Sequence, residues 1–413
     1  MRKNLVALSA GVAMLIAVTA CSSESSSGSG GGEGDVKLGL MTSVTGSLAS
    51  SFGQATIDGA QARISLANDT GELAGTKVSL VVGDERSDPN QGLATVQQLV
   101  DKEKVFAVLA SGAYFFNGYR YTVQKNVPAI GMGFDGPQWS DKNNSNLFAA
   151  WGSGDPAQPD FSGLGDYFKS RGGSSVCSLA LAGIPQTAGT VRSMQGSAQL
   201  AGLQTPYLNT EVPPGSTDFT AVSLAIKSSG CDILAASMTT GSYIALLAAT
   251  KNAGVTFKTS YLTSAYDQAI LDDPAALAVS DGIGFGAPWQ PASLKSAGTT
   301  QLMDALAKYA GWQKPNPTPG QMFGWFTADL AIKGLKVTGE NPTQEKFIES
   351  LRKVTDYDAN GLICPVDMSK WEGYIPGFPG NCTWVAQVEN GEFTSVTGQG
   401  PVKLAIEPGT SNK

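Results

Sequence analysis

The residue types that most often do chemistry in proteins are sparse in this chain. Its 413 residues contain no histidine, which excludes Ser-His-Asp triads, Cys-His dyads and metal sites built on imidazole. An enzyme would need paired carboxylates or a Ser-Lys dyad, and the fragment Ser140-Asp141-Lys142-Asn143 is the nearest match. Because its surroundings are polar and loop-like, we interpret it as a solvated turn. The sequence therefore predicts a protein that is not an enzyme, with no cofactor and no metal.

The sequence also argues against a dinucleotide- or phosphate-binding loop and against a nucleic-acid-binding protein. No predicted strand is followed by GxxxxGK[ST]. The glycine cluster at 131–136 matches GxGxxG at the end of a predicted strand, but it leads into Pro137 and Trp139 rather than into a helix, which argues against a dinucleotide site. The formal charge is −7 and the sequence pI is about 4.8, whereas nucleic-acid binders usually carry a basic stripe.

One cysteine has the setting of a lipid anchor. Arg2 and Lys3 precede an apolar stretch that is short for a membrane span and ends in Val18-Thr19-Ala20-Cys21. This resembles a bacterial lipobox, in which residues 1–20 form a signal peptide and the Cys21 thiol receives the lipid; an ordinary cleaved signal is the alternative. Residues 21–35 read as a flexible Gly/Ser tether. Removal of Arg2 and Lys3 changes the formal charge to −9.

The other four cysteines favour disulfides, because an even number in an exported chain usually pairs. Three connectivities are possible. Cys177 and Cys231 lie at or near the start of apolar runs that could be neighbouring strands, and Cys364 and Cys382 bracket a Gly, Pro and Trp-rich segment with little regular pattern. We therefore favour Cys177–Cys231 and Cys364–Cys382, with four buried free thiols as the alternative.

Short apolar runs alternate with helical patterns along the chain, which is typical of βα units and parallel sheets. The rhythm restarts after Asp155, so the length and the pattern predict two α/β units followed by three helices and a hairpin. The expected strands are 36–41, 77–83, 105–110, 127–131, 176–182, 203–210, 231–236, 259–263, 282–286, 382–388 and 393–397. The expected helices are 54–68, 90–102, 118–126, 159–171, 189–201, 216–229, 242–253, 302–309, 320–336 and 343–354.

Several local features occur together in one known order. They are Phe52-Gly53 before a helix that ends in Ile64-Ser65-Leu66-Ala67-Asn68-Asp69, then Gly83-Asp84, Asp88-Pro89, Val105-Phe106-Ala107-Val108-Leu109, Asn126-Val127-Pro128-Ala129-Ile130 and Gly230-Cys231-Asp232-Ile233-Leu234. This order resembles the type I periplasmic solute-binding proteins of the branched-chain amino-acid (Leu/Ile/Val) type, which feed ABC importers. The similarity covers residues 36 to about 397, and its specificity lies in order and spacing rather than in any single motif.

The resemblance implies an α/β fold of two doubly wound lobes joined by three interlobe crossings. We place the crossings near 151–156, 285–288 and 361–365. Lobe 1 is then 36–153 plus 287–361, and lobe 2 is 154–286 plus 362–410. It also implies a protein on the outer face of the cell membrane, anchored through Cys21. Its partners would be a small-molecule solute and the permease and ATPase subunits of an importer, with no nucleic acid, and the protein would be a monomer.

Ligands of such sheets bind beyond the carboxyl ends of the strands, in a cleft that closes on the solute. Aromatic side chains such as Phe52 and Trp289 would be apolar walls, and we expect Trp289→Ala to cost affinity rather than stability. The expected ligand-binding residues are Phe52, Ser111, Gly112, Ala113, Tyr114, Gly133, Phe134, Asp135, Gln186, Thr187, Thr239, Thr240, Tyr266, Asp267 and Trp289.

The sequence departs from the amino-acid-binding pattern in two places. Relatives that bind α-amino acids keep an acidic residue after the strand at 259–263, where this chain has Ala265, with Asp267 two positions later as a substitute. The carboxylate-binding hydroxyl after the fourth strand is replaced by Asp135, which would repel an anion. A larger, less polar or cationic solute is thus as compatible as leucine or valine. A sensory lipoprotein on the same fold is the alternative to transport.

Overall fold

The computed structural model describes residues 35–151, 160–263, 266–371, 373–375, 377–398 and 400–407, except for the side chains of residues 185–186. The predicted signal peptide, Cys21 and most of the tether lie outside these residues. Among the residues that the structure does describe, no helix combines the length and apolar character needed to cross a bilayer.

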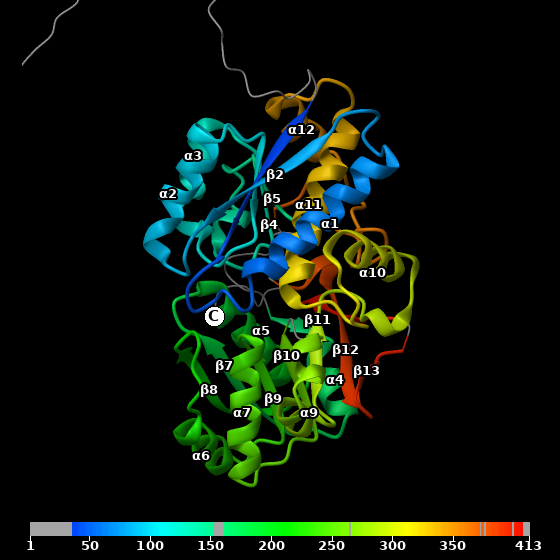
Figure 1. The fold of residues 1–413 in the computed structure, drawn as a ribbon. Helices are drawn as coiled ribbons and strands as arrows, with labels where there is room; N and C mark the ends of the chain where they lie inside the picture. Colours follow the sequence, from blue (N-terminus) through cyan, green and yellow to red (C-terminus); the bar gives the residue numbers. More distant parts are fainter. Residues whose placement is uncertain are drawn as a thin grey trace, which may run out of the picture. The chain divides into compact units, whose positions relative to one another are not determined.

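The first sheet is entirely parallel and is assembled from the start of the chain (Figure 1). β1 (Val36–Thr42), an interior strand, is buried along almost its whole length, as expected for a strand covered on both faces. The strand order is β2 (Val78–Asp84), β1 (Val36–Thr42), β3 (Ala107–Ala110), β4 (Ala129–Gly131) and β5 (Leu147–Ala149).

Helices from two distant parts of the sequence accompany this sheet. α11 contacts β3, β4, α1 and α12, so a late segment of the chain packs on early strands. The helices that follow the early strands are α1 (Gly53–Thr70), α2 (Gly92–Gln97) and α3 (Tyr119–Lys125). Those from the later segment are α10 (Ala297–Ala310), α11 (Pro319–Thr338) and α12 (Gln344–Leu351).

Two glycines let α1 and α11 approach each other closely. A Cβ atom at Gly59 would meet the backbone carbonyl of Gln321, and one at Gly324 would meet the backbone carbonyl of Thr56. Only glycine avoids such a collision. The contact fixes the start of α1 against the start of α11, and Figure 1 shows the two helices side by side.

The second sheet mixes parallel and antiparallel pairs. Strands β8, β7, β9, β10 and β11 are parallel, and β12 joins β11 antiparallel. The order is β13 (Glu392–Ser395), β12 (Cys382–Glu389), β11 (Gly284–Ala287), β10 (Thr259–Thr263), β9 (Ile233–Ser237), β7 (Ser175–Leu181) and β8 (Gln204–Val212), with β14 (Val402–Lys403) on β12. A separate small pair joins β6 (Phe161–Ser162) to β15 (Ala405–Ile406).

The helices between these strands alternate with them as predicted, but some helices begin later in the sequence than expected. The predicted helix at 159–171 begins only at Leu164 in the described part of the chain, because Gly163 has φ 102°. The predicted helix at 90–102 is a 3-10 turn, α2 and a π-helical turn in succession. The helices are α4 (Leu164–Ser170), α5 (Pro185–Leu200), α6 (Thr220–Ser229), α7 (Thr240–Asn252), α8 (Gln268–Asp272) and α9 (Pro274–Ser280).

Both predicted disulfides are confirmed. Cys177 lies in β7 and Cys231 lies two residues before the start of β9, the parallel neighbour of β7, and their Cα atoms are 5.7 Å apart. Cys364 joins Cys382, the first residue of β12, with Cα atoms 6.3 Å apart. The second bond therefore ties the irregular segment at 364–382 to the second sheet.

Candidate ligand-binding site

A cavity of about 170 Å³ lies where strand ends of both sheets meet. The first sheet contributes residues that follow β1 and β4, and the second contributes residues that follow β7, β9 and β10. The start of α11 closes one side through Thr318, Pro319 and Phe323. This is the position that the strand-end rule gives for ligands of open α/β sheets.

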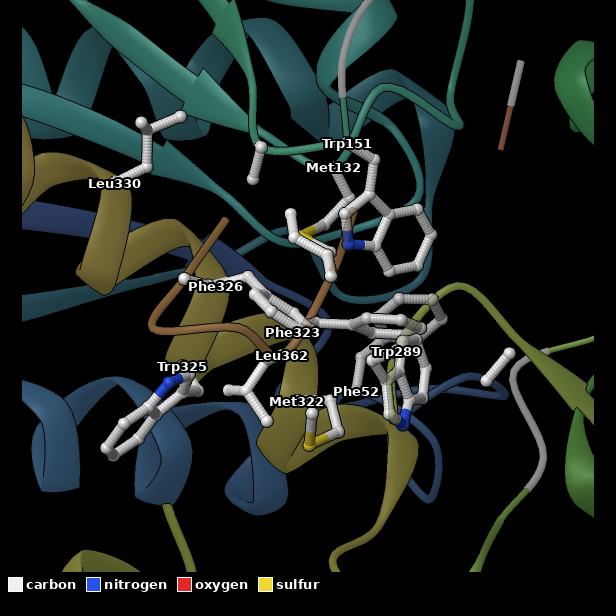
Figure 2. Packing of buried hydrophobic residues seen from close by; sticks show 14 of the residues in the cluster. Phe52, Met132, Trp151, Trp289, Met322, Phe323, Trp325, Phe326, Leu330 and Leu362 are labelled. Atoms are coloured by element: carbon white, nitrogen blue, oxygen red, sulfur yellow. The ribbon is translucent and has the colours of Figure 1, made fainter. Parts of the chain in front are cut away.

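The wall on the side of the first sheet and α11 is aromatic. Phe323 is the central ring, with its centroid 5.5 Å from those of Phe52 and Phe134 and 5.8 Å from that of Trp151. Phe52 directly precedes α1 and Phe323 lies in the second turn of α11, so the close contact of these helices brings the two rings together. Figure 2 shows Phe52, Phe323 and Trp151 in this cluster.

The wall on the side of the second sheet is rich in hydroxyl groups. Thr239 precedes α7 and Thr240 begins it, after β9, and Thr187 lies in the first turn of α5, after β7. The Thr187 hydroxyl is 2.8 Å from the carbonyl oxygen of Leu181, and the Thr239 hydroxyl is 3.1 Å from that of Ser242. These side chains offer polar contacts opposite the rings.

Asp267 is the one acidic side chain among the described residues of the wall, where the structure has no lysine or arginine. Its carboxylate accepts hydrogen bonds from the Thr240 hydroxyl at 2.6 Å and from the backbone N–H of Ala269, at the start of α8, at 3.0 Å. Burial raises the pKa of Asp267, although both hydrogen bonds act to lower it. The cavity thus combines an aromatic wall with a hydroxyl-rich wall that holds a carboxylate.

Six of the expected ligand-binding residues lie at this cavity: Phe52, Phe134, Thr187, Thr239, Thr240 and Asp267. The side chain of Gln186, like the whole of Ala265, lies outside the residues that the structure describes. The other expected residues do not line the cavity: Ser111, Gly112, Ala113, Tyr114, Gly133, Asp135, Tyr266 and Trp289.

The turn after β3, residues 111–114, forms hydrogen bonds with other parts of the protein. The Ser111 hydroxyl is 2.8 Å from that of Thr327 on α11. The backbone N–H groups of Ala113 and Tyr114 donate to the carboxylate of Glu85. The turn therefore lies against the protein interior rather than at the cavity.

Asp135 and its neighbourhood are also buried. The indole N–H of Trp139 and the amide of Gln138 donate to its two carboxylate oxygens, and 3% of the residue is exposed. Burial raises the pKa of Asp135 to about 7. Asp135 is thus a buried, internally bonded carboxyl.

Trp289 and Tyr266 lie behind the cavity wall. Only 2% of each residue is exposed. The Trp289 ring is 5.5 Å from Trp151 and 6.2 Å from Phe323, which do line the cavity. Figure 2 shows Trp289 beside Phe52 and Phe323. In this structure Trp289 supports the wall from within the core.

Several lining residues were not expected from the sequence. Ser50 and Ser51 precede α1, and Ser237 and Met238 end or follow β9, so the strand-end rule applied more broadly would have found them. Trp151 stands at the first predicted crossing and two residues after β5, so it carried a signal as well, whereas Phe323 carried none. Phe323 belongs to a helix in which 14 of 20 residues are buried, and periodicity does not tell which of its rings faces a cavity.

Comparison with known proteins identifies the fold and the family. The profile of the family described as "Periplasmic binding protein" matches residues 35–392. Leu/Ile/Val-binding protein homolog 1 of Brucella melitensis biotype 1 is 28% identical over 204 residues, which are 48% of this chain and 53% of that protein. The chain thus spans about half the length of the curated relatives it matches.

Solved structures share the fold over nearly the whole chain. A leucine-binding protein, LivK, of Thermotoga maritima has a TM-score of 0.70 at 17% identity and covers 89% of this chain and 99% of its own. A solute-binding protein of an R. palustris ABC transporter, in complex with benzoate, has a TM-score of 0.73 at 15% identity, with 92% and 99% covered. These confirm the predicted two-lobed α/β fold, and since the family profile spans most of the sequence, the chain belongs to the periplasmic binding protein family.

Proposed function

We propose that this protein is an exported, lipid-anchored binding protein that captures a small solute between its two lobes and presents it to an ABC permease. The observation that carries the proposal is the cavity formed by strand ends of both sheets. A solute that contacts both walls favours a closed arrangement of the lobes, and that arrangement is what a permease can recognise. In this role the protein binds without chemical change, as a monomer.

The aromatic wall favours a solute with an apolar body. The volume of the cavity, about 170 Å³, is close to that of an engineered apolar cavity of about 150 Å³ that binds benzene. The R. palustris structure is described in complex with benzoate and LivK is named a leucine-binding protein, so both a ring and a branched aliphatic side chain are sizes that relatives accept. We assign this chain a solute of the ring-bearing kind.

A ligand screen tests this function. Purified protein is melted with amino acids, amides, aromatic acids and sterol-like compounds, because a ligand that binds only the native state raises the melting temperature. Small-angle scattering on each hit should then show a smaller radius of gyration. A protein whose melting temperature and radius respond to none of these compounds would contradict the proposal.

The lipid anchor needs its own test, because Cys21 lies outside the described residues. We expect Cys21→Ser to release the protein from the membrane and to abolish labelling by a fatty-acid probe. Ser26→Ala, in the predicted tether, is the control, since it changes one nearby residue but leaves Cys21 and the lipobox intact. Unchanged labelling of the Cys21 variant would refute the anchor.

A further inference from the structure

A carboxylate of the protein itself occupies the backbone donors at the end of β3. Glu85 is fully buried. Its Oε1 accepts the backbone N–H of Ala113 at 2.9 Å and the Ser43 hydroxyl at 2.7 Å, and its Oε2 accepts the N–H of Tyr114 at 3.3 Å. Backbone N–H groups beyond a strand end are natural donors to an anion, but here they are already satisfied.

The packing around this carboxylate leaves no room for a second anion. A Cβ atom added to Gly112 would collide with the carboxylate of Glu85. Burial raises the pKa of Glu85, while the Ser43 hydroxyl and the two backbone N–H groups act to lower it. On this side the cavity therefore meets rings, chiefly Phe52, Phe134 and Phe323, rather than donors that could hold a ligand carboxylate.

The opposite wall also disfavours a negative charge. Asp267 is 7% exposed, and its carboxylate already lies at the start of α7 through its bond with Thr240. The described wall has no cationic side chain to balance a second carboxylate. Moving a charge out of water without a partner is costly. A hydrogen-bond donor on the ligand, in contrast, would find the remaining lone pairs of Asp267.

We propose that the cavity selects a solute with one ring-sized apolar body and a head group that donates a hydrogen bond to Asp267, either hydroxyl or ammonium, and that it rejects carboxylates. This substrate class rests on the solute-binding function proposed above. Benzoate, the ligand named for one structural neighbour, carries a carboxylate, whereas here the donors after β3 serve Glu85.

Three probes with the same ring test the class: benzyl alcohol, benzylamine and benzoate, measured by calorimetry at equal concentration. We expect the alcohol or the amine to bind at least tenfold more tightly than benzoate, and the stronger of the two identifies the head group. Benzoate binding as tightly as the better of the other two would overturn the class. Failure of all three probes to bind would overturn it as well.

Substitution of Asp267, the proposed hydrogen-bond acceptor, tests whether this residue causes the difference in affinity between the probes. Asp267→Asn keeps an oxygen that can cap α8. We expect this variant to bind the tighter of the two probes at least tenfold more weakly than the wild type does. The difference in affinity between that probe and benzoate should become smaller. Asp272→Asn, on the same short helix but with a side chain 42% exposed, is the matched control and should leave all three affinities unchanged. An Asp267→Asn protein with wild-type discrimination would refute the role of this carboxylate.

The outcomes also separate this inference from the function on which it rests. If leucine or an aromatic acid from the wider screen binds and compacts the protein while the alcohol and amine do not, the solute-binding function stands and the substrate class is wrong. If no compound of the screen or of the ring series binds, both proposals fall.

Discussion

Replacement of Trp289 by alanine distinguishes a cavity wall from a core. The sequence alone made Trp289 a wall residue, whose loss should reduce affinity by roughly two orders of magnitude and change stability little. The structure instead buries it, with 2% exposed, among Trp151, Phe323 and Phe326. The two interpretations predict opposite results for the same protein.

The expected destabilisation can be estimated from this burial. Truncation of a buried Trp to Ala typically costs about 3–5 kcal/mol. Unfolding entropy is about 2.1 cal/mol/K per residue, so a lobe of about 200 residues gains roughly 0.4 kcal/mol/K on unfolding. A loss of about 4 kcal/mol then lowers the melting temperature by roughly 10 °C. We expect affinity for the ring probes to fall less than tenfold, because Trp289 does not line the cavity.

Differential scanning calorimetry of the unliganded protein measures the first quantity, and titration calorimetry well below the transition measures the second. Trp312→Ala is the control, since Trp312 is only partly buried and donates its indole N–H to the Asn316 carbonyl at the periphery of the core. A Trp289 variant that melts no lower than the Trp312 variant, but binds a hundredfold more weakly, would refute the core interpretation.

Three further predictions concern buried charges and the first disulfide. Arg63→Met should destabilise the protein by about 3–5 kcal/mol in urea unfolding, because it leaves the partly buried Asp329 without its cation; an unchanged midpoint would contradict this. Loss of the Cys177–Cys231 bond, which spans 54 residues, should cost about 4 kcal/mol in the chain-entropy estimate; without reductant the double alanine variant should therefore melt below the wild type, and equal melting temperatures would contradict this. The pKa of Asp135 is raised to about 7, so the stability that this carboxyl contributes is complete below about pH 4 and is lost as the pH rises through 7. The melting temperature of the wild type should therefore fall relative to that of Asp135→Asn between about pH 4 and 7, and parallel melting profiles over this range would refute this.

The fold was predictable because its signal is local. Apolar runs such as the one in β1 alternate with helical faces such as that of α1, and the strand-plus-helix order is repeated. β5, with three residues, was not predicted, although it lies in the apolar run Leu147-Phe148-Ala149-Ala150-Trp151; the equally short β4 was predicted from its apolar run. The antiparallel pair β6–β15 was not predicted, because its strands have two residues each and lie far apart in the sequence.

The residues of the cavity could be predicted from the sequence only where a position just after a strand is enough to bring a side chain to the cavity. Thr187, Thr239 and Thr240 follow strands and reach the cavity. The same rule failed at Ser111–Tyr114, because Glu85 arrives from the end of β2 and takes the donors of that turn. Such a competition between a ligand and a distant side chain has no signature in either segment alone.

The antiparallel addition of β12 to β11 has a consequence for the order in which the chain acquires its structure. All strands of the first sheet precede residue 150, yet α11, which packs on β3 and β4, ends at Thr338, and the partner of β11 starts at Cys382. During synthesis from the N-terminus, the first sheet therefore lacks α11 until residue 338 has emerged, and the second sheet stays incomplete until the last tenth of the protein emerges. The first disulfide can close long before that moment, whereas the second cannot. A chain interrupted before residue 382 would expose the hydrogen-bonding edge of β11, a template for pairing with other chains, and premature termination should thus yield aggregates rather than a smaller folded protein.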